Sequence, residues 1–397
     1  MFTTLWCIIC NGTGMQPWKN KLLNIARTID TSTDNLALRL RQRLSAGKPA
    51  HIVAYRTYGT ARKIFVRGRV LEDKNIATAT EGDSLFTNLV NMYKRFESNE
   101  VPGAQVQIDV QGAEHLVTTD KEGFFVFDIH PEEPVITESL YHAVDLKLVY
   151  TPHNFQPFET TAEIMIPPPD AEYGIISDID DTVIRTGAHS LLAMGKTVLL
   201  SNARTRLPYP GVKEFYKALQ LGRNGQRNNP FFYVSSSPWN LYDLLIDFLD
   251  HNEIPAGPLL LRDFGLQSDS FVSGNYLGHK FKEIAQILDM YPHLNFVLVG
   301  DSGEQDPPIY LEVVKRYPGR ILAIYIRDVT IPEKHKIAQD VATELRSHGV
   351  EMILTEHSVQ AAEHAAATGL IFSNALPEIK ADKEQDQGAL PGKEEGV

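Results

Sequence analysis

The chain is poor in cysteine: its 397 residues contain two, Cys7 and Cys10. Two neighbouring cysteines give no disulfide framework, which favours a reducing compartment and predicts a cytoplasmic location. The Cys-x-x-Cys spacing is half of a redox or zinc motif. Because no second cysteine pair completes it, a bland structural role is the simpler interpretation.

Long apolar runs are also missing. A membrane-spanning helix needs about 20 consecutive apolar residues, and the sequence contains no such run, so we expect no transmembrane segment. The apolar segment Met1–Cys10 has no Lys or Arg before it and makes a poor signal peptide. Met15 is an alternative start.

Basic residues are outnumbered, with 38 Lys and Arg against 50 Asp and Glu and a formal net charge of −12. Non-specific nucleic-acid binding depends on neutralising phosphates with basic side chains. The composition therefore argues against a nucleic-acid partner.

The first 48 residues depart from this acidic balance. Between Met15 and Lys48 there are seven Lys or Arg against two Asp, and the apolar residues recur with helical spacing. Such amphipathic helices can lie on an anionic membrane surface, or they can pack on the next domain with solvated charges. Both interpretations stay open, so peripheral membrane contact is one expectation for residues 1–48.

Residues 49–168 are predicted to be β-rich. Short runs of β-branched and aromatic residues, separated by turn signals, favour a small β-sandwich with one interrupting helix near 84–96. The expected strands are 52–55, 63–71, 105–110, 124–129, 146–150 and 159–166. No catalytic constellation stands out, so a docking or structural role is expected of this region.

The proline run Pro167–Pro169 marks a boundary, after which the pattern changes. Apolar strands alternate with amphipathic helices from 169 to 374, which predicts an α/β domain with a doubly wound parallel sheet and helices on both faces. The last part, 375–397, is polar and charged, and we expect it to be a disordered tail.

Acidic residues follow two of the expected strands. Asp178 and Asp180 come after one of them, and Asp301 and Asp306 come after another. Because carboxylates repel one another, four of them at strand ends would be unfavourable without a cation between them. Hard oxygen ligands beside a substrate phosphate suit Mg²⁺, so the pattern predicts a magnesium site that handles phosphate.

Two further polar residues lie at corresponding positions. Ser235 follows the strand expected at 231–234, and Lys280 opens the helix expected at 280–290. In a doubly wound sheet the carboxyl ends of the strands gather at one edge, where ligands bind. Ser237-Pro238 has the composition of a helix cap followed by proline at the first helical position.

This ordered set resembles the haloacid dehalogenase superfamily of phosphohydrolases. The resemblance implies that Asp178 is the nucleophile and forms an aspartyl-phosphate. It implies that Asp180 protonates the leaving oxygen and then activates water, and that Thr182 shapes the loop. Ser235, with backbone N–H groups near Ser236, would hold a phosphate oxygen.

The same resemblance implies the roles of the charged groups. Lys280 would neutralise the nucleophile and the transferring phosphoryl group. Asp178, the carbonyl of Asp180 and Asp301 would hold Mg²⁺, with Asp306 acting through water. An acid at position 180 favours a phosphatase over a dehalogenase or a P-type ATPase.

A narrower resemblance extends from about 51 to 372. It rests on the segments Tyr55–Thr60, Gly68–Val70, Thr119–Phe125, Asp178–Gly187, Val234–Trp239, His279-Lys280, Gly300–Asp306 and Ile326–Asp328. These look like the family typified by the actin-patch-associated phosphatidate phosphatase. Membership implies Mg²⁺-dependent hydrolysis of phosphatidate, a phospholipid, to diacylglycerol and phosphate.

Two alternatives remain beside this reading. The first is the same chemistry on another phosphomonoester, such as a phosphoprotein, a nucleic-acid end or a metabolite. The second is a non-catalytic module that binds a membrane or a partner, although such a module has no need for all of Asp178, Asp180, Lys280 and Asp301. The insertion at 188–207 is too short for a large lid, and its apolar residues could touch acyl chains or pack a small cap.

Overall fold

The computed structural model describes residues 49–72, 100–135, 139–153, 155–184, 208–262, 276–329 and 331–388. Residues 49–397 form one compact unit, distinct from residues 1–48. The basic helices expected in 1–48, the helix expected at 84–96 and the insertion at 188–207 lie outside the described residues. Among the described residues, no helix is both long and apolar enough to cross a bilayer.

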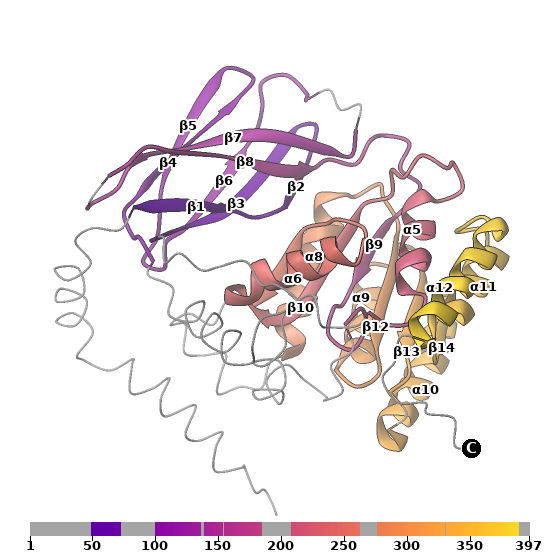
Figure 1. The fold of residues 1–397 in the computed structure, drawn as a ribbon. Coiled ribbons are helices and arrows are strands. Elements are labelled where there is room, and N and C mark those ends of the chain that lie inside the picture. The colour runs from indigo at the N-terminus through magenta and orange to yellow at the C-terminus, as the bar shows by residue number, and fades with distance from the viewer. Residues whose placement is uncertain are drawn as a thin grey trace, which may run out of the picture. The chain divides into compact units, whose positions relative to one another are not determined.

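Residues 50–165 are β-rich, as predicted, and form one hydrogen-bonded set of strands (Figure 1). The strands are β1 Ala50–Ala54, β2 Thr57–Thr60, β3 Lys63–Glu72, β4 Gln105–Val110, β5 Ala113–Thr118, β6 Phe124–Ile129, β7 Tyr141–Tyr150 and β8 Phe158–Met165. Their order is β1-β3-β2-β8-β7-β4-β5, and β6 pairs with β3. Alternate side chains of these strands form a buried core of their own.

Two of these strands, β2 and β5, were not predicted from the sequence. β5 is mostly exposed and has no apolar alternation, so a pattern based on burial cannot find it. Its signal is the turn before it, because Gln111 and Gly112 both have positive φ (56° and 83°) and form a tight two-residue hairpin with β4.

The second sheet has six strands, β9 Gly174–Ser177, β10 Phe231–Pro238, β11 Leu259–Arg262, β12 Phe296–Asp301, β13 Ile321–Arg327 and β14 Met352–Thr355. Their order is β11-β10-β9-β12-β13-β14, and every neighbouring pair is parallel. The α/β prediction with a parallel sheet is therefore confirmed. The carboxyl ends of the central strands β9 and β12 lie side by side.

Helices cover both faces of this sheet because successive strand residues point to opposite sides. Ile175, for example, belongs to one core and Ile176 to the other. The first core contains α5 Val212–Leu221, α6 Tyr242–His251 and α11 Ser358–Ala367, and the second contains α8 Tyr276–Met290, α9 Asp306–Arg316 and α10 Pro332–Ser347. Figure 1 shows these helices around the sheet.

The expected disordered tail at 375–397 is wrong for its first part. The short turn η3 Ser373–Ala375 leads into α12, Leu376–Gly388, which ends the described residues. Ile379 is fully buried in the core that contains α5 and α11. In addition, the carboxylates of Asp382 and Asp386 accept hydrogen bonds from the backbone N–H groups of Glu214 and Gly211 at the start of α5. The polar composition of this segment therefore reflects capping contacts as well as solvent exposure.

The two sheets are held together by aromatic contacts within the compact unit. The Tyr55 ring stacks on Trp239 with the centroids 4.6 Å apart, and Tyr58 packs edge-on against Phe232 at 5.5 Å. The Tyr291 hydroxyl donates to the Gly59 carbonyl at 2.9 Å. The β-rich region thus contacts the α/β region at β10, at the short turn η2 Trp239–Leu241 that follows it, and at the residue after α8.

Candidate active site

Asp178 lies at the carboxyl end of β9 and is almost completely buried. Its backbone N–H donates to the Val299 carbonyl at 2.9 Å, which continues the pairing of β9 with β12. The chain then turns sharply through Asp181, which adopts a left-handed φ of 54°. This turn brings the Thr182 hydroxyl within 3.3 Å of Asp178 Oδ2.

Asp180 is held by two serines of β10. The hydroxyls of Ser235 and Ser237 donate to Asp180 Oδ2 at 2.9 and 3.0 Å, while Oδ1 is buried and has no hydrogen-bond partner among the described residues. The prediction of Ser237 as a helix cap is wrong. β10 continues to Pro238, so Pro238 precedes the next helical turn and the Ser237 side chain is directed to Asp180.

Lys280 forms ion pairs with three carboxylates. Its ammonium lies 2.7 Å from Asp178 Oδ1, 2.9 Å from Glu304 Oε2 and 2.6 Å from Asp306 Oδ1. Lys280 lies inside α8 and does not open the helix, because α8 begins at Tyr276. Glu304 was not singled out from the sequence, although its place between Asp301 and Asp306 was a signal that it would lie near them.

In the loop from Gly300 to Asp306, backbone N–H groups donate hydrogen bonds to the loop's own carboxylates. Asp301 Oδ1 accepts from the backbone N–H groups of Gly303 and Glu304 at 2.5 and 3.0 Å, and Asp306 Oδ2 accepts from the Asp301 N–H at 3.1 Å. A Cβ at position 300 would lie 2.9 Å from Asp306 Cγ, so a side chain there would displace Asp306. The glycine is required for this close approach.

Burial raises the pKa of Asp178, Asp180, Asp301 and Asp306, because the charged form loses its hydration. The pKa of Asp180 rises to about 6 through burial and the nearby Glu304 carboxylate, against the opposing hydrogen bonds of Ser235 and Ser237. Burial and next Asp306 raise the pKa of Asp301 to about 8. The pKa values of Asp178 and Asp306 are also raised by burial, against the opposing charge of Lys280.

Burial alone would lower the pKa of Lys280, but its three carboxylate neighbours outweigh that effect and raise it. The ammonium is therefore a fixed positive charge beside Asp178. One such charge does not balance the carboxylates around it.

Three of these residues fit a cation site. Oxygens of Asp178, Asp301 and Asp306 lie within 4.8 Å of one another, and all three side chains are buried. Asp301 Oδ2 is buried without a hydrogen-bond partner among the described residues. A group of carboxylate oxygens with an unpartnered member suits a hard divalent cation such as Mg²⁺.

The structure brings together seven of the eight residues singled out from the sequence through the contacts given above. These are Asp178, Asp180, Thr182, Ser235, Lys280, Asp301 and Asp306. The eighth, Ser236, is half-buried, and its side chain makes no hydrogen bond to a described residue. The role expected near Ser236 involves its backbone, and it stays a prediction.

Residues 173–328, which include this site, match the family described as phosphatidate phosphatase APP1, catalytic domain. Phosphatidate phosphatase APP1 of Saccharomyces cerevisiae is 36% identical over 155 residues, which cover 39% of this chain and 25% of that protein. The site therefore lies in a segment similar to a catalytic domain of the phosphatase class. More particularly, residues 173–328 are similar to the phosphatidate phosphatase APP1 catalytic domain, which confirms the resemblance over this segment.

A second relative is an uncharacterized protein of Schizosaccharomyces pombe, 28% identical over 265 residues, which cover 65% of this chain and 40% of that protein. The chain thus spans about a quarter and two fifths of the lengths of these two relatives. Among solved structures, a carbohydrate acetylesterase from Xanthomonas citri covers 80% of this chain and 75% of its own with 10% identity and a TM-score of 0.28. That score is too low to support an argument.

Proposed function

We propose that the chain is a Mg²⁺-dependent phosphatidate phosphatase that releases phosphate from phosphatidate and leaves diacylglycerol. The observation that carries this proposal is the pairing of buried Asp178 with Lys280, beside an Asp180 held by two serines. The family of residues 173–328 supports the choice of substrate. We also propose that the parallel sheet is the doubly wound, haloacid dehalogenase-like fold and that the β-rich region is a small β-sandwich.

In the proposed reaction, an oxygen of Asp178 attacks phosphorus and the bond to the diacylglycerol oxygen breaks. Asp180 gives its proton to the leaving oxygen, for which a pKa of about 6 is well suited near neutral pH. The now ionised Asp180 then takes a proton from water, whose oxygen attacks phosphorus and releases Asp178 and inorganic phosphate. Lys280 offsets the negative charge of the transferring group at Asp178.

Mg²⁺ would be held by Asp178, the Asp180 carbonyl and Asp301, with Asp306 acting through water. Its charge would stabilise the negative phosphoryl oxygens during transfer. The excess of buried carboxylates over ammonium groups supports a cation here.

The test is phosphate release from phosphatidate in mixed micelles with Mg²⁺, beside a panel of soluble phosphomonoesters. Preference for phosphatidate supports the proposal, and activity confined to soluble esters would keep the mechanism and discard the substrate. No phosphate release from any substrate would favour the hypothesis of a non-catalytic binding module. EDTA is expected to abolish turnover and added Mg²⁺ to restore it, whereas turnover that persists in EDTA would contradict the metal site.

Asp178→Asn and Asp180→Asn are each expected to lower kcat by about 100-fold or more, since one removes the nucleophile and the other the proton donor. Far-UV circular dichroism should show an unchanged fold. The control is Asp340→Asn on the exposed face of α10, which removes the same charge from a side chain that is not part of the site. Near-normal turnover of purified Asp178→Asn would contradict the covalent mechanism.

A further inference from the structure

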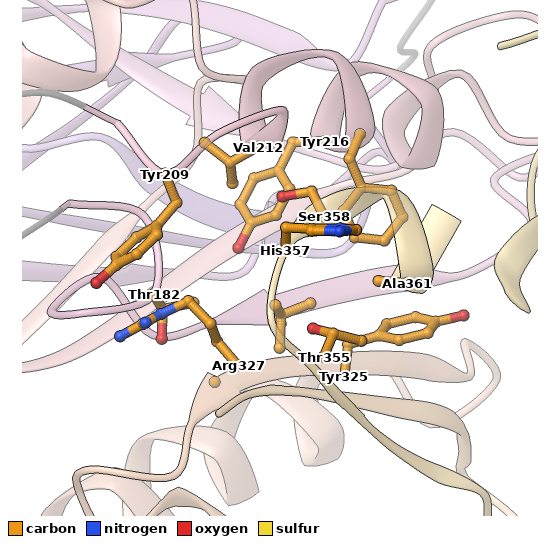
Figure 2. Close-up of a pocket in the computed structure, with 13 residues that line it drawn as sticks. Thr182, Tyr209, Val212, Tyr216, Tyr325, Arg327, Thr355, His357, Ser358 and Ala361 are labelled. Atoms are coloured by element: carbon orange, nitrogen blue, oxygen red, sulfur yellow. The ribbon is translucent and has the colours of Figure 1, made fainter. Parts of the chain in front are cut away.

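A pocket adjoins the candidate active site on the face of the sheet that α5 and α11 cover (Figure 2). Part of its lining is apolar and aromatic, and includes Val212, Phe215 and Tyr325. Thr182 also lines it, and the hydroxyl of Thr182 lies 3.3 Å from Asp178 Oδ2. A ligand in this pocket would therefore be next to the proposed nucleophile.

Arg327 lines this pocket from the end of β13, where it is in register with Asp301 of β12. Its guanidinium carbon lies 3.7 Å from the centroid of the Tyr209 ring, and its Nε donates to the Asp181 carbonyl. Figure 2 shows the Arg327 and Tyr209 side chains at the same end of the pocket. Within the described ranges, the two terminal nitrogens of Arg327 make no hydrogen bond and no carboxylate pairs with it. The Arg327 side chain is thus held in place, while its terminal N–H groups have no acceptor among the described residues.

A guanidinium held by stacking and by one backbone acceptor is well suited to bind ligand oxygens, since little freedom is lost when it donates. A second polar group also lines the pocket. The His357 Nδ1 atom is buried without a hydrogen-bond partner among the described residues, and His357 precedes the first turn of α11 without a side-chain cap. Backbone N–H groups at a helix start favour acceptor oxygens as well.

The pocket lining therefore combines hydrogen-bond donors with apolar and aromatic side chains. Carbonyl oxygens beside hydrocarbon have this chemistry, and so does the glycerol-ester part of a phosphoglyceride. A second phosphate would match these donors but would gain nothing from Val212 and Phe215.

We propose that this pocket is a specificity subsite for the ester oxygens next to the scissile phosphate, with Arg327 donating to an ester carbonyl. The inference rests on the proposed phosphatase function and adds to it the part of the chain that selects a glycerolipid. Arg327 itself takes no part in phosphoryl transfer.

The experiment measures kcat and KM of the full chain with Mg²⁺ on four substrates. These are dioctanoyl phosphatidate, its dialkyl ether analogue without carbonyls, p-nitrophenyl phosphate and a soluble sugar bisphosphate. Arg327→Gln is compared with the wild type and with Lys336→Gln, which removes an exposed positive charge from α10. Arg327→Lys keeps the charge and loses the planar fork.

For the wild type we expect a higher kcat/KM on the ester than on the ether. Arg327→Gln should lower kcat/KM on the ester by about 10- to 100-fold, mainly through KM, because a charged donor is lost. The loss on the ether and on p-nitrophenyl phosphate should be several-fold smaller, so that the ester-to-ether ratio falls towards one. Arg327→Lys should recover part of the ratio, and Lys336→Gln should match the wild type.

Equal losses on all substrates would overturn the subsite and leave Arg327 as a support of the Asp181 turn. No loss on any substrate would overturn it as well, and so would a selective loss on the bisphosphate, which would indicate recognition of a second phosphate. Wild-type activity on p-nitrophenyl phosphate without an ester preference would refute the subsite while sparing the phosphatase mechanism. A wild type with no activity on any of the four substrates would refute both the subsite and the phosphatase mechanism.

Discussion

Five carboxyl groups and one ammonium group meet in the candidate active site, and all but Glu304 are nearly inaccessible to solvent. Such an arrangement costs folding free energy, because the carboxylates repel one another and lose hydration. The raised pKa values of these carboxyl groups reflect that cost. Asp301 is a clear example, because its pKa rises to about 8. Residues arranged for binding a cation commonly reduce the stability of the cation-free protein.

Asp301→Asn is therefore expected to stabilise the protein in EDTA. A carboxyl whose pKa is raised by folding favours the fold below its unfolded pKa and loses that contribution as pH rises through the folded value. At pH 9 the variant should unfold with a free energy about 1–2 kcal/mol higher than the wild type, and the difference should shrink towards pH 5. Urea unfolding at both pH values measures it.

Thermal unfolding with added Mg²⁺ is the complementary measurement. It should raise the Tm of the wild type and leave that of Asp301→Asn nearly unchanged, because binding to the folded state is lost. Asp340→Asn, on the exposed face of α10, is the matched control. A variant less stable than the wild type at pH 9 in EDTA would contradict this description of the site.

At this scale the sequence predicted which aspartates, serine and lysine would meet, because the carboxyl ends of parallel strands share one edge. It could not predict the contacts of Ser237 and Glu304. The Ser237 contact depends on β10 continuing to Pro238, and that extension is set by tertiary contacts. Glu304 reaches Lys280 because the loop folds back around Asp301, a detail that no spacing encodes.

Among the elements, α12 is the one that departs most from expectation. Its sequence is strongly polar, yet the segment supplies two carboxylates to the start of α5 and buries Ile379. α5 has Gly211 before its first turn and no side-chain cap of its own, so Asp382 and Asp386 take that role from a distant part of the chain. These carboxylates stabilise α5 because their negative charge lies near the positive, N-terminal end of the helix dipole.

Ile379→Ala is expected to lower the free energy of unfolding by about 2–4 kcal/mol, the usual range for emptying a fully buried aliphatic site. Gln385→Ala, at an exposed position of the same helix, should change it by less than about 0.5 kcal/mol. Denaturant unfolding of both variants measures the difference. Equal stability of the two would mean that α12 does not dock in solution.

At the scale of the whole molecule, the β-rich region and the α/β region are expected to act as one folding unit. Tyr55, Tyr58 and Gly59 contact Trp239, Phe232 and Tyr291 across the two sheets. Arg56 adds a bidentate pair with Asp250 at 3.0 and 2.9 Å. Apolar and aromatic surface buried in this way would be exposed if either region unfolded alone.

A chain beginning at Pro49 tests this point, because Trp239 is then its single tryptophan. Trp239 lies between the two regions, so its fluorescence reports their contact, whereas far-UV circular dichroism reports the whole backbone. The two urea transitions should coincide, as expected for cooperative unfolding. A fluorescence transition well before the circular dichroism transition would show that the regions separate first.

The basic segment 1–48 belongs to the same scale. If its expected helices bind anionic membranes, removing residues 1–48 should reduce co-sedimentation with phosphatidylserine vesicles, with the larger effect at low salt. Asp178→Asn in both chains separates binding from turnover. Unchanged binding at every salt concentration would favour packing on the adjoining domain.

Phosphorylation of Asp178 is the central step of the proposed reaction, and Asp180→Asn is the variant with which to observe it. Without Asp180 to activate water, an aspartyl-phosphate formed from p-nitrophenyl phosphate should accumulate. The measurement is mass spectrometry of acid-quenched, proteolysed protein. For Asp180→Asn we predict one phosphate on the peptide that contains Asp178. The double variant that carries both Asp178→Asn and Asp180→Asn should have no phosphate on this peptide. An unmodified peptide from a variant whose wild type turns over the same substrate would contradict the mechanism.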